Sequence, residues 1–227
     1  SSAVYDAPTT WKAIVKNAKN VVFWATDPIV TNQISSVPPT HEGYDAYAKL
    51  KEMNAKGEKK IYAVDTYKND TIRYLNSDFI GVVPGTDTAM MIGMCHYLYE
   101  NKLYDEAFIG KYTVGFNKFK DYFLGTNDNV VKNLDWASKI CGVSIKKLEE
   151  LCASLVKNES LIISGFAIQR QDHGEQSYWA LITLASMLGH IGKEGCGFMT
   201  CDQGHKTSTD SFIAPALKGL SSVPSEK

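Results

Sequence analysis

The stretch Leu161–Gly197, LIISGFAIQRQDHGEQSYWALITLASMLGHIGKEGCG, gives the strongest indication of the fold. It opens with an apolar run, 161–164, which ends at a glycine and therefore predicts a short buried strand. Polar residues crowd into 169–176, and the apolar pattern of 177–191 then predicts a helix that Gly192 ends. Open α/β sheets bind ligands beyond the carboxyl ends of their strands, so a polar segment between a strand and a helix indicates a ligand site.

Further apolar runs lie upstream, and each predicts a buried strand that ends in polar or turn-forming residues. These runs cover 20–26, 60–65 and 79–83. Helical patterns cover 41–57, 86–101, 105–112, 117–123, 135–141 and 144–156, and Thr9 or Thr10 is expected to cap a first helix through Ala18. Residues 29–39 are expected to form a loop. Strands that alternate with helices predict an α/β fold, a Rossmann-like, doubly wound, mainly parallel sheet with helices on both faces.

Length and composition favour one globular domain over residues 1–227, with an irregular tail over 200–227. Apolar residues make up 44% of the 227 residues and charged residues 22%. The net charge of -1 offers no basic surface for nucleic acid, and no apolar run approaches the roughly 20 residues of a membrane helix. The five cysteines include no C-x-x-C pair, so we expect no iron–sulfur cluster, no zinc ribbon and no metal ligand in this chain.

The predicted strand ends carry the chemistry. They are W-A-T-D-P at 24–28, V-D-T-Y-K-N-D-T at 64–71, P-G-T-D at 84–87 and G-F-A-I-Q-R at 165–170. In a doubly wound sheet these turns lie along one edge. Together they offer carboxylates, hydroxyls, glycine backbone and a guanidinium. That set suits a nucleotide, because carboxylates accept hydrogen bonds from ribose or guanine, and helix N-termini bind phosphate.

Each strand end also has a purely structural interpretation. The pair Asp27-Pro28 is typical of a turn, and Asp65 could cap the following segment. Thr86 could cap a helix that has Asp87 in its first turn. The polar residues of the last strand end allow similar readings: Gln169 and Arg170 could join an ion-pair network with Glu175, and His173 and His190 could be structural histidines. The first strand is not followed by G-x-G-x-x-G, which disfavours an ordinary NAD site.

The segment G-F-A-I-Q-R-Q-D-H-G-E-Q-x-x-W at 165–179 resembles the molybdopterin enzymes that reduce trimethylamine N-oxide, dimethyl sulfoxide and biotin sulfoxide. Shorter motifs of that family recur in the same order. They are W-x-x-[DN]-P at 24–28, P-x-x-D at 84–87, I-C-G-V at 140–143, M-L-G-x-I-G at 187–192 and G-x-G-F at 195–198. The resemblance covers nearly the whole chain and is closest to the trimethylamine N-oxide reductases.

This resemblance implies an interior domain, excised from a longer enzyme, that binds one of the two molybdopterin guanine dinucleotides around a single molybdenum. The cofactor-binding residues it implies are Trp24, Ala25, Thr26, Asp27, Pro28, Asn32, Asp65, Thr66, Tyr67, Lys68, Thr71, Gly85, Thr86, Asp87, Gly165, Phe166, Gln169 and Arg170. It further implies oxygen-atom transfer in the full enzyme, with Arg170 as the positive group near the oxide oxygen and His173 as a proton donor. The family's serine ligand to molybdenum lies outside this chain, so the chain alone is expected to be inactive.

The partners implied are the remaining domains of the same polypeptide, a small N-oxide or S-oxide, and a c-type cytochrome as electron donor. The compartment implied is the periplasm, within anaerobic respiration, with the cytoplasm as the alternative. Two competing hypotheses stay open from the sequence. One is a stand-alone guanine-nucleotide-binding Rossmann-like module without catalysis, and the other is a structural domain with an empty groove.

Overall fold

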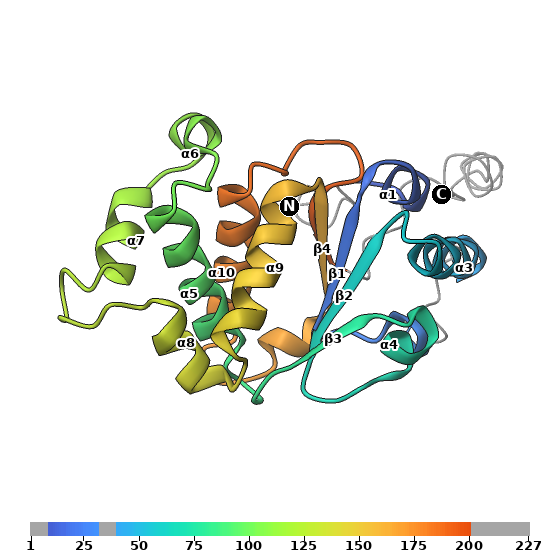
Figure 1. Ribbon diagram of the computed structural model, residues 1–227, viewed down its shortest axis with the longest axis horizontal. Helices are drawn as coiled ribbons and strands as arrows, with labels where there is room; N and C mark the ends of the chain where they lie inside the picture. Colours follow the sequence, from blue (N-terminus) through green and yellow to red (C-terminus); the bar gives the residue numbers. More distant parts are fainter. Residues whose placement is uncertain (1–8, 32–39, 201–227) are drawn as a thin grey trace, which may run out of the picture.

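A five-stranded parallel sheet forms the centre of the structure (Figure 1), a computed structural model that describes residues 9–31 and 40–200 without the side chains of 40–44. The strand order is β3-β2-β1-β4-β5, and every neighbouring pair is parallel. The strands are β1 (Asn20–Trp24), β2 (Lys60–Asp65), β3 (Asp78–Gly81), β4 (Ser160–Ser164) and β5 (Gly197–Thr200). The order reverses between β1 and β4, which is where doubly wound sheets bind their ligands. The predicted fold class is confirmed.

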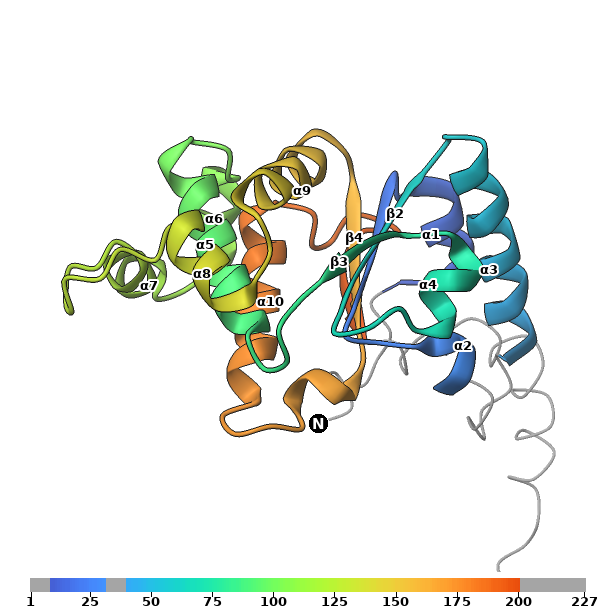
Figure 2. The ribbon, with the colours of Figure 1, turned by 60° about the horizontal axis from the view of Figure 1, so that its bottom comes forward.

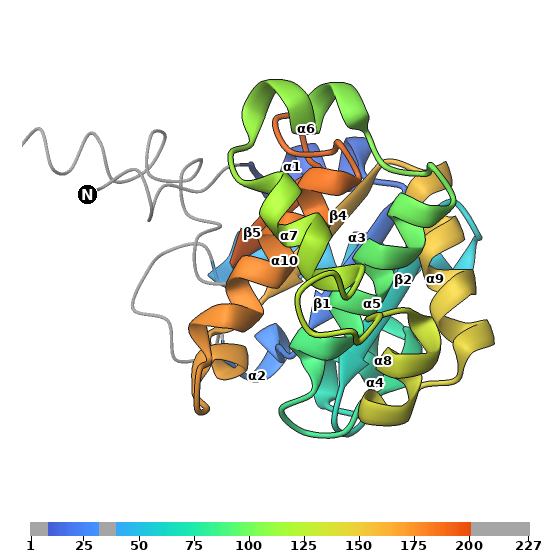
Figure 3. The same cartoon turned by 90° about the vertical axis from the view of Figure 1, so that its left-hand side faces the viewer.

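Helices cover both faces of this sheet (Figure 1). One face carries α1 (Trp11–Asn17), α3 (Thr40–Ala55) and α4 (Asp70–Leu75). The other carries α5 (Asp87–Glu100), α8 (Leu134–Cys141), α9 (Ile145–Lys157) and α10 (Glu175–Met187), with α6 (Glu106–Tyr112) and α7 (Phe116–Phe123) farther from the sheet. On this side α5 packs against α8 and α10 (Figure 3), so α5 is the central helix of its layer.

The alternation of side chains along each strand divides the apolar residues into two cores. Along β1, Val22 and Trp24 enter the core beneath α5, α8, α9 and α10, whereas Val21 and Phe23 enter the core beneath α1, α3 and α4. All five residues of β1 are buried, as expected for a central parallel strand covered on both sides. The period of two along a strand thus sends the Trp24 indole toward the helix layer that contains α5.

Side-chain caps begin several helices at the residues that the sequence suggests. The Thr10 hydroxyl accepts a hydrogen bond from the Ala13 N–H at 3.1 Å, and the Ser144 hydroxyl accepts one from the Lys147 N–H at 3.3 Å. Thr86 occupies the cap position of α5 but makes no such bond, because its hydroxyl donates to the Val83 carbonyl at 2.7 Å. The first turn of α5 is therefore left without a side-chain cap from Thr86.

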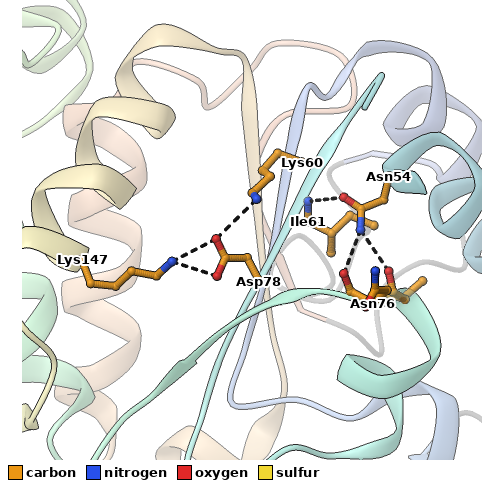
Figure 4. A network of polar contacts seen from close by, with 7 residues as sticks. Asn54, Lys60, Ile61, Asn76, Asp78 and Lys147 are labelled. Atoms are coloured by element: carbon orange, nitrogen blue, oxygen red, sulfur yellow. Dashed lines mark hydrogen bonds and ion pairs between the residues drawn. The ribbon is translucent and has the colours of Figure 1, made fainter. Parts of the chain in front are cut away.

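Polar side chains tie the sheet to its helices at the amino ends of the strands (Figure 4). The Asp78 carboxylate at the start of β3 binds Lys147 of α9 at 2.8 and 3.0 Å and Lys60 of β2 at 3.4 Å. Asn54 of α3 donates to the Asn76 carbonyl at 3.0 Å and accepts from the Ile61 N–H at 3.3 Å. Burial raises the pKa of Asp78, but its two lysines outweigh burial and hold that pKa below the ordinary value. These contacts strengthen the edge opposite the ligand-binding edge.

His190 has a structural environment. Its side chain is buried, and Nδ1 accepts a hydrogen bond from the Ser160 N–H at 3.3 Å at the start of β4. Burial, aided by Lys193, lowers the pKa of His190 to about 4, so the neutral imidazole is the form that fits the fold.

The structure corrects the sequence-based elements in several places. The segment 29–39 was expected to be a loop, but Pro28–Thr31 forms a helical turn, α2, and residues 32–39 lie outside the described part. Neither α4 nor β5 was expected from the apolar pattern of the sequence. Thr200, predicted to begin an irregular tail, is the last residue of β5, and the predicted tail over 201–227 lies outside the described residues.

Gly93 is the point of closest approach between α5 and α8. A Cβ at this position would overlap the Ala137 Cβ and lie 3.1 Å from the Asn133 carbonyl oxygen. We expect Gly93→Ala to destabilise the fold by about 1–3 kcal/mol, because overpacking forces the two helices apart. Urea unfolding followed by circular dichroism measures the change.

Gly110 provides the matched control, because it also lies inside a helix but a Cβ there meets nothing within 4 Å. Gly110→Ala should be neutral or stabilising by about 0.5–1 kcal/mol, since alanine has the higher helix propensity. Equal midpoints for the two variants would contradict the close packing of α5 on α8.

Candidate functional site

A cavity of about 420 Å³ opens at the carboxyl ends of β1, β2 and β4. Figure 2 shows the turns after these strands, α2 and the short 3-10 helix Phe166–Gln169 at this edge of the sheet. The cavity is lined by Ala25, Thr26, Asp27, Thr31, Asp65, Thr66, Tyr67, Asn69, Pro84, Gly85, Asp87, Ala167, Ile168, Arg170 and Gln171. All four strand ends singled out in the sequence contribute, so the predicted groove exists as a geometric feature.

The structure brings only part of the expected cofactor-binding set into this lining. The expected residues that line the cavity are Ala25, Thr26, Asp27, Asp65, Thr66, Tyr67, Gly85, Asp87 and Arg170. Those that lie outside the lining are Trp24, Pro28, Lys68, Thr71, Thr86, Gly165, Phe166 and Gln169. Asn32 lies outside the described residues.

Asp27 and Thr71 are bonded to each other. The Asp27 Oδ1 accepts from the Thr71 hydroxyl at 2.6 Å and from the Thr71 N–H at 3.0 Å, and Oδ2 accepts from the Asp70 N–H at 3.3 Å. The carboxylate therefore caps the first turn of α4 from a different loop. Thr71 is fully buried, which explains why it does not reach the cavity.

Asp65, at the end of β2, is half-buried, and both of its oxygens are held in place. Oδ1 accepts from the Thr66 N–H at 2.6 Å, and Oδ2 accepts from the Asn69 side-chain amide at 2.9 Å. Burial raises the pKa of Asp65, and the nearby Asp87 carboxylate adds to the increase, although the bonds from Thr66 and Asn69 oppose it. The cavity wall thus holds a carboxylate in a fixed orientation.

Asp87 is the first residue of α5 and is only 6% exposed. The indole Nε1–H of Trp24 donates to Asp87 Oδ1 at 2.8 Å. Burial raises the pKa of Asp87, and the indole bond opposes that increase. Trp24 therefore acts on the cavity indirectly, through the carboxylate that it holds, and a carboxylate with one such donor keeps capacity for more.

Backbone geometry brings the turns after β1 and β4 together. Ala25 has φ +48°, a left-handed conformation that costs a non-glycine residue about 1–2 kcal/mol. A Cβ on Gly165 would lie 2.7 Å from the Thr26 hydroxyl oxygen, so the approach of these turns requires glycine. Strained backbone of this kind is common at ligand sites.

Arg170 and His173 have different positions relative to the cavity. Arg170 is the one positively charged side chain among the described residues of the lining. His173 lies outside the lining, has φ +54°, and forms an exposed pair with Asp172 at 3.0 Å. Its role as a proton donor stays a prediction. The alternative interpretation, a network between Gln169, Arg170 and Glu175, is not observed among the described ion pairs.

Sequence reasoning missed several lining residues, namely Thr31, Asn69, Pro84, Ala167, Ile168 and Gln171. Asn69 had a usable signal, because asparagine before Asp70-Thr71 is typical of a helix cap. The position of Gln171 depends on tertiary contacts, since its amide donates to the Ile168 carbonyl at 3.0 Å and to the Ser177 hydroxyl at 3.1 Å.

Other hollows exist, but their linings carry a different chemistry. A larger one, of about 720 Å³, lies beside α6 and α7 and includes the rings of Tyr99, Tyr104 and Phe116. It lies away from the strand ends and lacks their set of buried carboxylates, so the cavity at the sheet edge is the better candidate for a nucleotide site.

The described part of the chain offers neither a cluster of metal ligands nor a membrane-spanning helix. No group of three or more His, Cys, Asp or Glu side chains is placed to hold a metal ion within the described ranges. Among the helices of that same part of the chain, none has the length and apolarity needed to cross a membrane.

Comparison with known proteins links this architecture to a family. A family model described as molybdopterin oxidoreductase matches residues 2–215. The chain is 42% identical over 225 residues to a trimethylamine-N-oxide reductase of Vibrio vulnificus, covering 99% of this chain and 27% of that protein. It is 41% identical over 217 residues to a dimethyl sulfoxide/trimethylamine N-oxide reductase of Rhodobacter capsulatus, covering 96% and 26%. The chain thus spans about a quarter of the length of these relatives.

A solved structure with a similar fold is that of acetylene hydratase from Pelobacter acetylenicus. It superposes with a TM-score of 0.61 at 18% identity, covering 78% of this chain and 22% of that one. At this identity the likeness concerns the fold alone.

The bond between Trp24 and Asp87 can be tested without any ligand. Trp24→Phe removes the indole N–H, so the ionised form of Asp87 loses a donor and its pKa should rise by about half a unit or more. Carboxyl ¹³C NMR titration of the chain measures that pKa.

Trp11→Phe serves as the control, because Trp11 is also buried but lies in the other core, against the Tyr47 ring. An Asp87 pKa that is the same in wild type and Trp24→Phe would contradict the proposed effect of the bond.

Proposed function

This chain belongs to the molybdopterin oxidoreductase family, and from that membership we propose that it is the nucleotide-binding domain of a molybdenum-dependent reductase of N-oxides or S-oxides. Family membership implies a molybdopterin cofactor. The finer proposal is that the cavity binds one molybdopterin guanine dinucleotide. The observation that carries the reductase assignment is 42% identity to a trimethylamine-N-oxide reductase across 99% of the chain.

The lining of the cavity fits the nucleotide end of such a cofactor. Its volume of about 420 Å³ lies within the usual range of small-molecule sites, about 300–1,000 Å³. Asp65 and Asp87 are held by neutral donors, and no lysine or arginine forms an ion pair with either among the described residues. Such carboxylates suit a ligand that brings hydrogen-bond donors. Guanine presents the N1–H and N2–H pair, which a carboxylate can accept bidentately and which adenine lacks.

We assign the guanine edge to Asp87 and the ribose hydroxyls to Asp65. Asp87 is the more deeply buried of the two, and a buried carboxylate discriminates more strongly because an unpaired one is costly. Thr66, Tyr67 and Gly85 line the same region and would enclose the nucleoside. Trp24 would act from behind this lining, through its bond to Asp87. For the other residues implied by the resemblance, a contact with the cofactor stays a prediction.

Arg170 would provide the positive charge of the site. It belongs to the turn after β4, whereas the carboxylates of the lining lie at or after the ends of β1, β2 and β3. The bound cofactor supplies the two-electron chemistry of oxygen-atom transfer, and the protein supplies orientation and electrostatics. We propose that the Arg170 guanidinium stabilises negative charge near the oxide oxygen, with His173 as a proton donor on the exposed side.

The partners and compartment follow from the same proposal. The remaining domains of the polypeptide would complete the substrate funnel and provide the metal ligand. A c-type cytochrome is the proposed electron donor, and the periplasm is the proposed compartment, with the cytoplasm as the alternative.

Asp87→Asn tests the guanine assignment in the enzyme that contains this chain. The amide presents an N–H where guanine also presents N–H, so binding should weaken by about 1–3 kcal/mol, or roughly tenfold to a hundredfold. The molybdenum and guanine nucleotide contents of the purified enzyme measure the loss.

Asp70→Asn is a closely matched control, because Asp70 is also the first residue of a helix but is exposed and lies outside the lining. Full cofactor content in Asp87→Asn, with an unchanged melting temperature, would remove Asp87 from the site.

Arg170→Lys tests the catalytic assignment. Lysine keeps the charge but loses the planar fork of donors, so turnover of trimethylamine N-oxide should fall by about tenfold while cofactor content stays normal. Arg73→Lys is the control, since Arg73 is the other arginine of the chain and pairs with Asp70 outside the lining. Equal turnover in the two variants would exclude Arg170 from the reaction.

A further inference from the structure

Asn69 lies at the point where the turn after β1, the end of β2 and the start of α4 meet. Its side chain is 2% exposed and uses both ends of its amide. Oδ1 accepts from the Ile72 N–H at 2.9 Å, which caps α4. Nδ2 donates to Asp65 Oδ2 at 2.9 Å and to the Thr26 carbonyl at 3.1 Å. Because all three bonds depend on one rigid amide plane, the cap on α4 also fixes the direction of the donor toward Asp65.

The Asp65 carboxylate depends on this donor. The Thr66 N–H holds Oδ1, but Thr66 is the next residue of the chain and sits on an exposed turn. Only the Asn69 amide, among the described contacts, reaches Oδ2. Without it the carboxylate could rotate about its terminal bond, which is broad and roughly two-fold in its preference.

The influences on the pKa of Asp65 also indicate a role for the Asn69 donor. Its burial and the neighbouring Asp87 carboxylate disfavour the ionised form, whereas the bonds from Thr66 and Asn69 favour it. The lining places no lysine beside Asp65, and Arg170 belongs to the turn after β4. The Asn69 amide therefore opposes the increase in the pKa of Asp65 without adding a positive charge, which leaves the carboxylate available to a ligand.

The start of α4 has a second support that does not involve Asn69. The Asp27 carboxylate accepts from the Asp70 N–H at 3.3 Å and from the Thr71 N–H at 3.0 Å. The first turn of α4 is therefore capped by two side chains from different loops. A change at Asn69 can remove the contact with Asp65 while the helix stays anchored.

We propose that Asn69 is a positioning residue, which orients the Asp65 carboxylate toward the hydroxyl donors of a bound nucleoside. This inference rests on the proposed nucleotide-binding function of the cavity. It adds a specific device to that site: an amide that links the helix cap to the ligand-binding acid.

Asn69→Ser separates the two roles, because serine is a good cap that can still accept from the Ile72 N–H but has no amide to reach Asp65. Asn133→Ser is the matched control, since Asn133 caps α8 by accepting from the Trp136 N–H at 2.9 Å and lies outside the cavity lining. Two quantities are measured on the chain: the pKa of Asp65 by carboxyl ¹³C NMR, and the affinity for GDP by calorimetry.

We expect Asn69→Ser to raise the pKa of Asp65 by about half a unit or more and to weaken GDP binding about three- to tenfold. Asn133→Ser should change neither quantity. The effect should also depend on the acid: in an Asp65→Asn background, Asn69→Ser should cause no further loss of GDP affinity, because a residue that acts through another is non-additive with it.

The possible failures are distinguishable. An unchanged Asp65 pKa in Asn69→Ser overturns the positioning role, even where wild type binds GDP. An equal loss of GDP affinity from Asn69→Ser in the wild-type and Asp65→Asn backgrounds also overturns the positioning role. Asn69 would then act through the helix alone. A third outcome is that the wild-type chain binds no GDP, although Asn69→Ser raises the pKa of Asp65. That outcome overturns the nucleotide function and the ligand role of Asn69. Only the electrostatic link between Asn69 and Asp65 would then remain.

Discussion

The rest of the site depends on one constraint: the parallel strands β1, β2 and β4 end at about the same level in the sheet. Trp24, the last residue of β1, pairs with Val64 of β2 on one side and with Ser164 of β4 on the other. Because the three strands end at the same height, the turns that follow them meet within hydrogen-bonding distance. Asn69 reaches the Thr26 carbonyl, and Gly165 approaches the Thr26 side chain, for this reason. A shift of register by one residue would reverse the faces of a strand and separate these groups.

The acids of the cavity share a second property, which is that neutral groups hold them. An indole holds Asp87, an amide and a backbone N–H hold Asp65, and a hydroxyl with backbone N–H groups holds Asp27. Lysine or arginine partners would have lowered the pKa of these acids and satisfied their charge within the protein. Neutral donors fix the geometry and leave negative potential in the cavity, in keeping with a ligand rich in N–H and O–H donors.

The sequence predicted the layers of the fold well, because buried parallel strands are nearly continuous apolar runs that end at turn residues. It also placed Asp65, Asp87 and Arg170 correctly at one edge, since a strand end is a local feature. It missed β5, a short strand that pairs with β4 at the edge of the described sheet and follows a glycine-rich segment typical of loops. It missed α4 because a helix of 6 residues is too short to show a clear helical period. The bond between Asp27 and Thr71 joins residues 44 positions apart, so no local pattern could show that this acid caps a helix.

At the amino ends of the strands, Asp78 binds Lys147, and Asn54 binds the Asn76 carbonyl (Figure 4). These contacts have a consequence for how such a domain can change over time. They anchor the sheet at the border that faces away from the ligand, while the turns at the other border carry the recognition chemistry. Substitutions in those turns therefore leave the contacts at the amino ends of the strands intact. Related domains can therefore differ in what they bind and still keep these contacts, because this part of the sheet's anchorage lies away from the ligand.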